Sequence, residues 1–425
     1  MAGLSNPRIP AQYVFATAWQ ASAGSAASTA DALQWVCQSG SGLKRNSQRI
    51  DPQGSTGSQF DKIGSSREVA TQPDGKFVMP ASTRALSFFL ESITAGQPTV
   101  VDGDITETGD DGSLLNTWAL TGLRPGFNTE IDSSGLWKIY VTADADAPTG
   151  TDTTIDLYSD SSRTAKVATG TIVDGSVPGT VTLAEANSSG LSGTVTLASV
   201  PAGDDTDIVL SVGKITMNYA LQYARFFTAW QDTGNELLRI VDCVVDSIKI
   251  SAEDLGVVMA EITFLGKTYT NNATALSAAT PEVNFLSFSD GVYQSDANGT
   301  PVTEFPMSFE LTLKRKVTAY HGSSTTPQAL ISEGFEAISG KLSYKPTDAA
   351  DTIFGTSIAD TTEDGFTAIF TRSPQVLSIT MDKVKWLQTE QPEFGENEIN
   401  NWDLEFKVGE RDDASVVPVL FTLEH

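Results

Sequence analysis

The sequence predicts a mainly β protein with two related β domains, each carrying one short helix, and a β-sandwich inserted into the first domain. Three observations predict this arrangement: short runs of alternating apolar and polar residues, a faint internal duplication, and a Thr-, Gly-, Ser- and Asp-rich stretch that interrupts the first copy. The chain has 425 residues, which is enough for two or three domains with full hydrophobic cores.

The strand signals are clearest in the C-terminal half of the chain. Runs that alternate apolar and polar residues occur at 309–313, 341–344, 376–381 and 402–408, and each is bounded by Gly, Pro, Asp or Ser. A period of two places apolar side chains on one face and polar side chains on the other, as in half-buried antiparallel strands. We therefore expect sheets with one buried face and one solvated face.

Two short segments have the pattern of helices. The first lies at 80–90, because Pro80 is tolerated at a helix start and the apolar residues from Ala85 to Leu90 share one face. The second begins near 346–348, where a threonine or an aspartate can act as the N-cap.

Residues 227–256 repeat at 366–395. Without a gap, seven of these thirty positions are identical. The identical pairs are Phe227/Phe366, Thr228/Thr367, Ala229/Ala368, Leu238/Leu377, Ile240/Ile379, Val245/Val384 and Gly256/Gly395. Most of them are apolar strand positions or turn residues, which is where a shared fold would place them, so we expect two copies of one domain.

Two further echoes indicate an insertion in the first copy. Residues 43–45 resemble 313–315, and residues 75–80 resemble 340–346, in the same order. The first copy is much longer between its echoes and its repeat than the second copy is. The simplest account is an insertion between roughly 97 and 222, whose short β runs and turns predict a small, outward-facing β-sandwich.

These features divide the chain into four parts. The parts are an N-terminal arm at 1–37, a first domain at 38–96 and 221–275, an inserted domain at 97–220, and a second domain at 276–425.

The charge of the chain excludes several partners. It has 53 acidic and 27 basic residues, a net charge of −26. Affinity for phosphates comes from Lys and Arg, so we expect neither specific nucleic-acid binding nor binding to an anionic membrane. No apolar run reaches the length of a membrane span, and the N-terminus lacks the charged-then-apolar order of a signal peptide.

The sequence offers little catalytic chemistry, and we expect no enzyme, no cofactor and no metal. The only cysteines, Cys37 and Cys243, form no disulfide framework and suit synthesis in a reducing cytosol. Of two histidines, His321 is the single candidate base for a triad, in a loop where solvation is the usual role. Acidic clusters at 102–112 and 204–207 lack the spacing of an EF-hand. Phosphate-binding and dinucleotide-binding glycine motifs do not occur.

Residues 237–250, followed by 256–267, resemble the strand pair of phage tail tube proteins of the long-tailed, non-contractile kind, in which the partner strand ends at Gly-Lys. Residues 335–342 resemble the next strand of that family. The resemblance covers about two-thirds of the chain, excluding the insertion and the first forty residues.

This resemblance implies tail-tube-type β-sandwich or barrel domains, six of which close a ring around a lumen, with rings stacked into a tube. A chain with two such domains would form a homotrimer with pseudo-sixfold symmetry. The expected localisation is the virion, after synthesis in the host cytoplasm. The expected partners are further copies of the chain, a tape-measure protein, tail terminator and tail-tip proteins, and DNA that passes transiently to the host. An acidic lumen would let DNA slide without sticking.

Eight residues are candidates for contacts between subunits. They are Tyr13, Phe15 and Trp19 of the N-terminal arm, together with Lys44, Arg45, Arg49, Lys314 and Arg315. Aromatic residues on a loose arm commonly become ordered on a partner, although a strand packed within its own domain is an equal alternative. The basic residues can pair with acids across an interface or lie in solvated loops. The arm also contains an unexplained echo, since 15–20 resembles 226–231.

Two other functions remain open at this point. A carbohydrate-binding or adhesin-type β protein is suggested by the Thr-, Gly- and Asp-rich insertion and by seven tryptophans. A hydrolase that uses acids alone would need converging carboxylates in a deep pocket.

Overall fold

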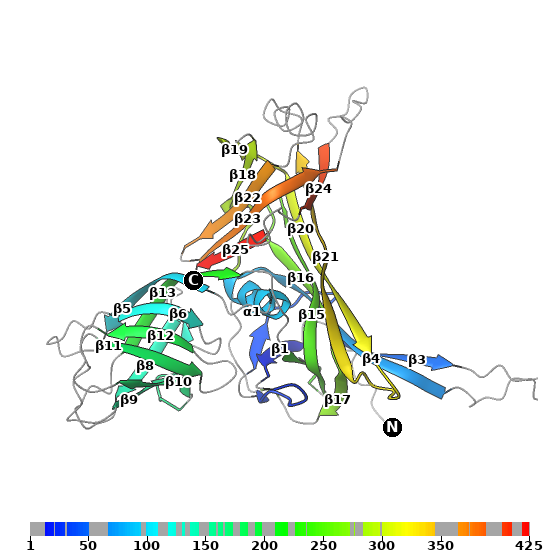
Figure 1. Ribbon diagram of the computed structural model, residues 1–425, viewed down its shortest axis with the longest axis horizontal. Helices are drawn as coiled ribbons and strands as arrows, with labels where there is room; N and C mark the ends of the chain where they lie inside the picture. The colour runs from blue at the N-terminus through cyan, green and yellow to red at the C-terminus, as the bar shows by residue number, and fades with distance from the viewer. Residues whose placement is uncertain are drawn as a thin grey trace, which may run out of the picture.

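The structure is a computed structural model, and it describes most of the chain between residues 13 and 424. The described residues are 13–20, 22–29, 32–50, 67–94, 99–108, 118–124, 130–131, 137–143, 153–158, 160–164, 166–172, 179–185, 192–197, 209–219, 226–234, 236–272, 276, 284–297, 300–344, 364–373, 375–387, 402–409 and 419–424. Over these residues the protein is mainly β, with one α-helix and a large antiparallel sheet. The expected fold class is therefore confirmed at this level (Figure 1).

The chain forms its strands in three groups. The first group has β1 (Val14–Trp19), β2 (Leu33–Trp35), β3 (Gly42–Ile50), β4 (Arg67–Pro80) and the helix α1 (Thr83–Thr94), and it continues after a long interruption with β14 (Phe227–Asp232), β15 (Leu237–Glu253), β16 (Met259–Leu265) and β17 (Thr268–Asn272). The second group has a 3₁₀ turn, η3 (Phe288–Asp290), and the strands β18 (Gly291–Ala297), β19 (Thr300–Glu304), β20 (Ser308–Tyr320), β21 (Ala329–Tyr344), β22 (Asp364–Arg372), β23 (Gln375–Trp386), β24 (Trp402–Val408) and β25 (Val419–Glu424). The four predicted strand segments lie in β20, β21, β23 and β24.

The third group interrupts the first. Its strands are β5 (Thr99–Thr108), β6 (Trp118–Arg124), β7 (Glu130–Ile131), β8 (Trp137–Ala143), β9 (Thr153–Tyr158), β10 (Lys166–Ile172), β11 (Gly179–Glu185), β12 (Ser192–Leu197) and β13 (Val209–Tyr219). Strand β13 pairs with β5 and β8, and pairing continues from β8 through β9, β10, β11 and β12 to β6. These strands gather in a lobe beside the rest of the chain (Figure 1).

The first and second groups share one pattern of antiparallel pairing. In the first group the pairs are β1–β2, β1–β14, β3–β4, β4–β16, β14–β15, β15–β16 and β15–β17. In the second group they are β18–β19, β18–β22, β20–β21, β21–β24, β22–β23, β23–β24 and β23–β25. The two lists match when the strands are taken in chain order. In this order β1, β2, β3, β4, β14, β15, β16 and β17 correspond to β18, β19, β20, β21, β22, β23, β24 and β25, respectively.

The two groups are joined edge to edge within one sheet. Strand β15 pairs with β20, from Ser247 opposite Lys314 to Glu253 opposite Ser308. The strand order across the joined sheet is therefore β3, β4, β16, β15, β20, β21, β24 and β23. Strand β15 of the first group thus lies directly beside strand β20 of the second group.

Helix α1 packs against the apolar face of this sheet. The helix begins three residues later than Pro80, because Ser82 acts as its N-cap and accepts the backbone N–H of Ala85 through its Oγ at 3.2 Å. All twelve helix residues are buried. The predicted helix at 80–90 is thereby confirmed, and the second predicted helix near 346–348 lies outside the described residues.

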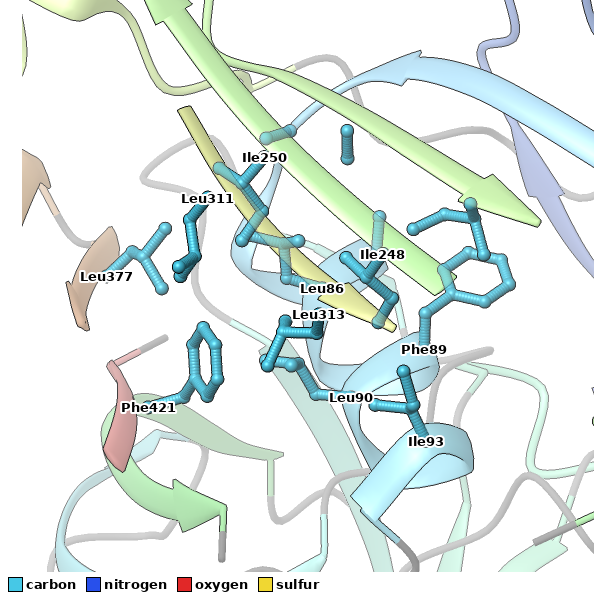
Figure 2. Close-up of a cluster of buried hydrophobic side chains, with 14 of the residues drawn as sticks. Leu86, Phe89, Leu90, Ile93, Ile248, Ile250, Leu311, Leu313, Leu377 and Phe421 are labelled. Atoms are coloured by element: carbon cyan, nitrogen blue, oxygen red, sulfur yellow. The ribbon is translucent and has the colours of Figure 1, made fainter. Parts of the chain in front are cut away.

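The hydrophobic core lies between α1, the sheet and the strands β23 and β25. Figure 2 shows helix side chains meeting side chains of β15, β20, β23 and β25. The labelled residues are Leu86, Phe89, Leu90 and Ile93 of the helix, with Ile248, Ile250, Leu311, Leu313, Leu377 and Phe421 of the strands. Because α1 of the first group also contacts β23 and β25 of the second, the two groups share this core.

Candidate functional site: the polar face of the joined sheet

The joined sheet has one polar face opposite its core face. Phe309, Leu311 and Leu313 of β20 are buried, so the intervening Glu310 and Thr312 point the other way. The same alternation holds in β16 and β24 and over residues 247–253 of β15, where buried and more exposed residues alternate along the strand. Six neighbouring strands, β4, β16, β15, β20, β21 and β24, therefore present a continuous polar face, which we call the polar face below.

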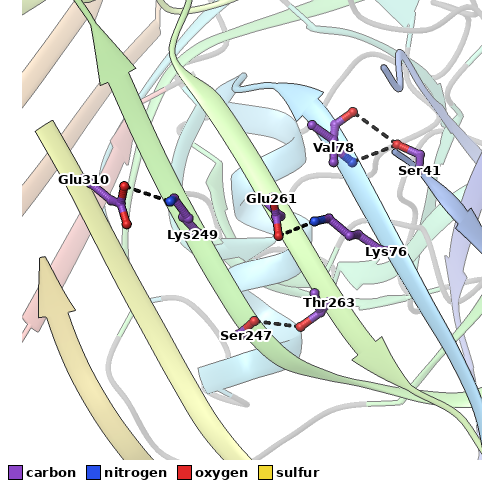
Figure 3. A network of polar contacts seen from close by, with 8 residues as sticks. All are labelled: Ser41, Lys76, Val78, Ser247, Lys249, Glu261, Thr263 and Glu310. Atoms are coloured by element: carbon purple, nitrogen blue, oxygen red, sulfur yellow. Dashed lines mark hydrogen bonds and ion pairs between the residues drawn. The ribbon is translucent and has the colours of Figure 1, made fainter. Parts of the chain in front are cut away.

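Four lysines of the polar face each pair with a carboxylate on a neighbouring strand. The pairs are Lys76–Glu261 at 2.5 Å, Lys249–Glu310 at 2.7 Å, Lys314–Glu336 at 2.7 Å and Lys341–Asp403 at 2.6 Å. Figure 3 shows two of these pairs, Lys249–Glu310 and Lys76–Glu261, and the hydroxyl contact between Ser247 and Thr263 farther along the same two strands, β15 and β16. The cross-strand spacing of a sheet favours such pairs.

Two of the ion pairs occupy equivalent places in the two groups. Lys76 follows Gly75, which lies directly opposite Phe264 in the β4–β16 pair. Lys341 follows Gly340, which lies directly opposite Phe406 in the β21–β24 pair. In both places the phenylalanine ring fills the space beside the glycine, since a Cβ atom on Gly75 would lie 2.1 Å from Phe264 and one on Gly340 would lie 2.2 Å from Phe406. The repeated Gly-Lys of the sequence thus marks a packing requirement and an ion pair together.

These ion pairs change the charge of the face more than its stability. The eight side chains are 38% to 50% exposed, and solvent screens pairs this exposed, so they contribute little to stability. Hydrogen bonding to Glu336 raises the pKa of Lys314, and the same bond lowers the pKa of Glu336. Burial alone would raise the pKa of Asp403, but hydrogen bonds from Lys341 and Ser343 outweigh it and lower that pKa. Each of the four lysines therefore already has a carboxylate partner on a neighbouring strand.

Asp246 lies beside this pattern on β15. Its carboxyl is half-buried, and burial raises its pKa, although the Lys314 ammonium and a backbone hydrogen bond at Val317 act against the rise. Burial therefore disfavours the ionised form of Asp246.

The aromatic residues predicted to contact another subunit lie largely inside the chain itself. Phe15 is 3% exposed and Trp19 is fully buried, with its ring stacked on that of Phe88 at 4.1 Å between centroids. Tyr13 is partly buried and packs against the same core. For residues 13–19 the structure thus matches the alternative of a strand packed within its own chain. The remainder of the arm, residues 1–12, lies outside the described residues.

The echo between 15–20 and 226–231 has a structural counterpart. Strands β1 and β14 lie side by side and antiparallel, with Thr17 opposite Ala229 and Ala18 opposite Thr228. The two similar segments are therefore related by an approximate twofold axis within one sheet, a relation that the sequence showed but did not explain.

The basic candidates have two different environments. Lys44, Arg45 and Arg49 are exposed on β3, where Arg45 pairs with Glu68 of β4 at 3.0 Å. Lys314 is paired on the polar face, as described above. The contacts that these four residues were expected to make with another subunit stay a prediction.

Arg315 lies inside the chain. It is 3% exposed, and its guanidinium donates to the carbonyl of Ile93 in the last turn of α1 and to the hydroxyl of Ser332. A cation at this position suits the negative end of the helix, whose own last turn has no basic residue. This environment leaves Arg315 little surface to offer a neighbouring subunit.

The described residues hold few groups with metal or thiol chemistry. They contain no cluster of three or more His, Cys, Asp or Glu residues arranged to hold a metal ion. Within the same residues, no helix combines the length and apolarity that a membrane crossing needs. Cys37 and Cys243 are both free thiols. Neither the family models nor the curated proteins with which the sequence was compared match it.

Proposed function

We propose that the protein is a structural subunit of a phage-type tail tube, in which its two groups of strands are copies of one domain. The observation that carries the proposal is the repeated pairing pattern joined through β15 and β20 into one sheet. A contact that joins one copy to the next inside the chain can also join one chain to the next. Repeated contacts of this heterologous kind close into rings when the rotation permits.

The ring that we propose is a homotrimer with pseudo-sixfold symmetry. By analogy with β20, the counterpart strand β3 of one chain would pair with the region of β23 in the neighbouring chain. Among the described residues β3 pairs with no strand other than β4, and the Leu43 N–H donates to Gln231 Oε1 at 2.8 Å. Beyond Leu43, a neighbouring strand could pair along the other edge of β3. Pairing of this edge would also remove the aggregation hazard of an open strand.

In this proposal the polar face lines the lumen through which DNA passes. Its lysines are paired with carboxylates, and the chain as a whole carries a charge of −26. Lysines that are already paired with carboxylates displace few counterions from DNA, so the surface has little affinity for DNA. The inserted strands would then lie outside the tube, and the tape-measure, terminator and tail-tip proteins would be the further partners in the virion.

Electron microscopy of the purified protein at rising concentration, with mass photometry alongside, tests this proposal. We expect particles of three subunits with a central hole, and stacks of them at high concentration. Persistent monomers that bind a glycan array would instead support the carbohydrate-binding alternative.

A further inference from the structure

The turn between β15 and β16 exposes a large apolar side chain in an unfavourable backbone conformation. Leu255 is 94% exposed and has a φ of 60°, in the left-handed region that non-glycine residues seldom occupy. The turn is well held, because the Asp254 N–H donates to the Met307 carbonyl at 2.8 Å and the Gly256 carbonyl accepts the Phe288 N–H at 2.9 Å. The leucine is thus presented to solvent by an ordered turn.

A second apolar side chain stands next to this turn. Phe305 is 77% exposed and lies two residues before Met307, the residue that binds Asp254. Val257, which follows the turn, is 45% exposed. We call Leu255, Val257 and Phe305 the apolar knob. The exposed acids Glu253 and Asp254 flank it, so the knob is apolar with an acidic border.

The opposite end of the same strands is apolar with a basic border. Strand β20 begins beside the knob, is 13 residues long and ends at Tyr320, which is 56% exposed. At about 3.3 Å per residue the two ends are roughly 40 Å apart. The connection after Tyr320 is tied to β4, since the Thr71 N–H donates to the Thr325 carbonyl at 2.7 Å. This bond holds the β3–β4 ribbon, with Lys44, Arg45 and Arg49, at that end (Figure 1).

We infer that the apolar knob of one copy docks on the basic end of a second copy, so that copies stack head to tail along the strand direction. The receiving surface is made of Tyr320, Ile331 and Val69, which are 56%, 47% and 37% exposed, together with the basic residues of β3. Acids border the knob, whereas Lys44, Arg45 and Arg49 of the receiver outnumber the two nearby acids of β4, Glu68 and Asp74, so the net charges are complementary. Two different surfaces that meet head to tail build an open filament instead of a closed pair.

This inference rests on the proposed tube and names the contact between its successive rings. The variant Leu255→Gly tests the docking role of the leucine without weakening the fold of the subunit. Glycine relieves the left-handed φ and removes only exposed surface, so the isolated subunit should be at least as stable as the wild type. Combined with Phe305→Ser, it should raise the protein concentration needed for half-maximal stacking at least tenfold, while rings form as before.

A charge exchange provides the matched control. Neither Glu253→Lys/Asp254→Lys nor Lys44→Glu/Arg45→Glu/Arg49→Glu should stack alone, because each places like charges at the contact. An equimolar mixture of the two should stack, since the altered knob of one then meets the altered ribbon of the other. Rescue by mixing is a result that a merely misfolded variant cannot give.

The outcomes distinguish this inference from the tube proposal. If the wild type and the Leu255→Gly/Phe305→Ser variant form tubes at the same concentration, the knob contact is overturned while the tube stands. If the wild type shows no rings, sedimentation velocity still measures head-to-tail association: chains of copies that the variant lacks would support the knob without the ring, and monomers throughout would overturn both.

Discussion

Gln20 and Asp242, which lie 222 positions apart, hold each other by two hydrogen bonds. The Asp242 N–H donates to Gln20 Oε1 at 2.7 Å, and Gln20 Nε2 donates to Asp242 Oδ1 at 2.8 Å. The same carboxylate oxygen accepts the Gly24 N–H at 2.7 Å. Asp242 has a φ of 57° and is 3% exposed, at the point where β15 leaves its pairing with β14 and begins its pairing with β16. One buried aspartate thus fixes both the bend of the longest strand and the loop after β1.

Replacing Asp242 with alanine should be strongly destabilising. The change removes two hydrogen bonds to a carboxylate and places a Cβ without polar compensation at positive φ, which together cost roughly 2–4 kcal/mol. Asp242→Asn is the matched control, because asparagine tolerates this φ and keeps the accepting oxygen. The urea midpoint of unfolding should fall far more for alanine than for asparagine, and equal shifts would contradict this account.

Alanine at Gly75 and at Gly340 should have similar effects. In each case the new Cβ would lie about 2 Å from a phenylalanine ring of the neighbouring strand, at 2.1 Å for Phe264 and 2.2 Å for Phe406. Overpacking of this kind costs roughly 1–3 kcal/mol. Gly42→Ala is the control, since its nearest neighbour would be 4.0 Å away. Thermal unfolding should show a drop for the first two variants only, and a drop at just one would argue that the two sites are not equivalent.

Neutralising the carboxylates of the polar face should create affinity for DNA. The variant carries Glu261→Gln, Glu310→Gln, Glu336→Gln and Asp403→Asn. It frees four lysines, so duplex DNA should bind with a log–log salt slope of about −3 to −4, while the wild type does not bind under the same conditions. Fluorescence anisotropy at several salt concentrations measures this.

The control for that experiment removes the same charge elsewhere. It carries Asp232→Asn, Glu236→Gln, Glu253→Gln and Asp254→Asn, four acids that form no ion pair with a lysine within the described residues. Equal DNA binding by both variants would show that net charge alone, and not the release of paired lysines, is responsible.

Asp246→Asn should stabilise the protein at neutral pH. Burial raises the pKa of Asp246 in the folded state, so its ionisation opposes folding once the pH is above the unfolded value of about 4. Asparagine removes this penalty, by less than about 1 kcal/mol because the group is only half-buried. The advantage should shrink as the pH falls through the raised pKa of the folded state, and should be gone below about 4, where aspartate is protonated in both states. Melting temperatures from pH 3 to pH 8, with Asp254→Asn as an exposed control, measure it; a pH-independent gain would contradict the mechanism.

Both thiols should resist modification while the protein is folded. Burial raises the pKa of Cys37 to about 12, against an opposing hydrogen bond from Ser41, and raises the pKa of the fully buried Cys243 well above its ordinary value. Since the thiolate is the reactive form, a disulfide reagent at pH 8 should label neither residue quickly. Guanidinium should release two thiols per chain. Cys243 is buried and Cys37 is partly buried, so rapid labelling of both thiols in the native protein would contradict this account.

The sequence predicted the strands well because a period of two is a local property. It also placed α1 within a few residues and indicated the repeat that the strand pairing displays. It missed the ion pairs of the polar face, since which lysine meets which carboxylate depends on the register between distant strands.

Arg315 shows how the same pattern can be misread. It follows Phe309, Leu311 and Leu313 at the same spacing, so the alternation of β20 already places it on the buried face. Its charge suggested a surface contact, but the end of α1 supplies a buried carbonyl for the guanidinium. The bond between Gln20 and Asp242 gave no signal at all, because nothing local marks a contact over 222 positions.

The length of β15 also has a mechanical consequence. Its 17 residues pair along their course with β14, β16, β17 and β20. Ladder hydrogen bonds run perpendicular to the strands, so tension applied along β15 loads many of them in shear at the same moment. A pull across the sheet would instead open them one after another. The subunit should therefore be stiff and hard to extend along this strand, and should yield first where a single ladder can peel, as in the outer half of the β3–β4 ribbon.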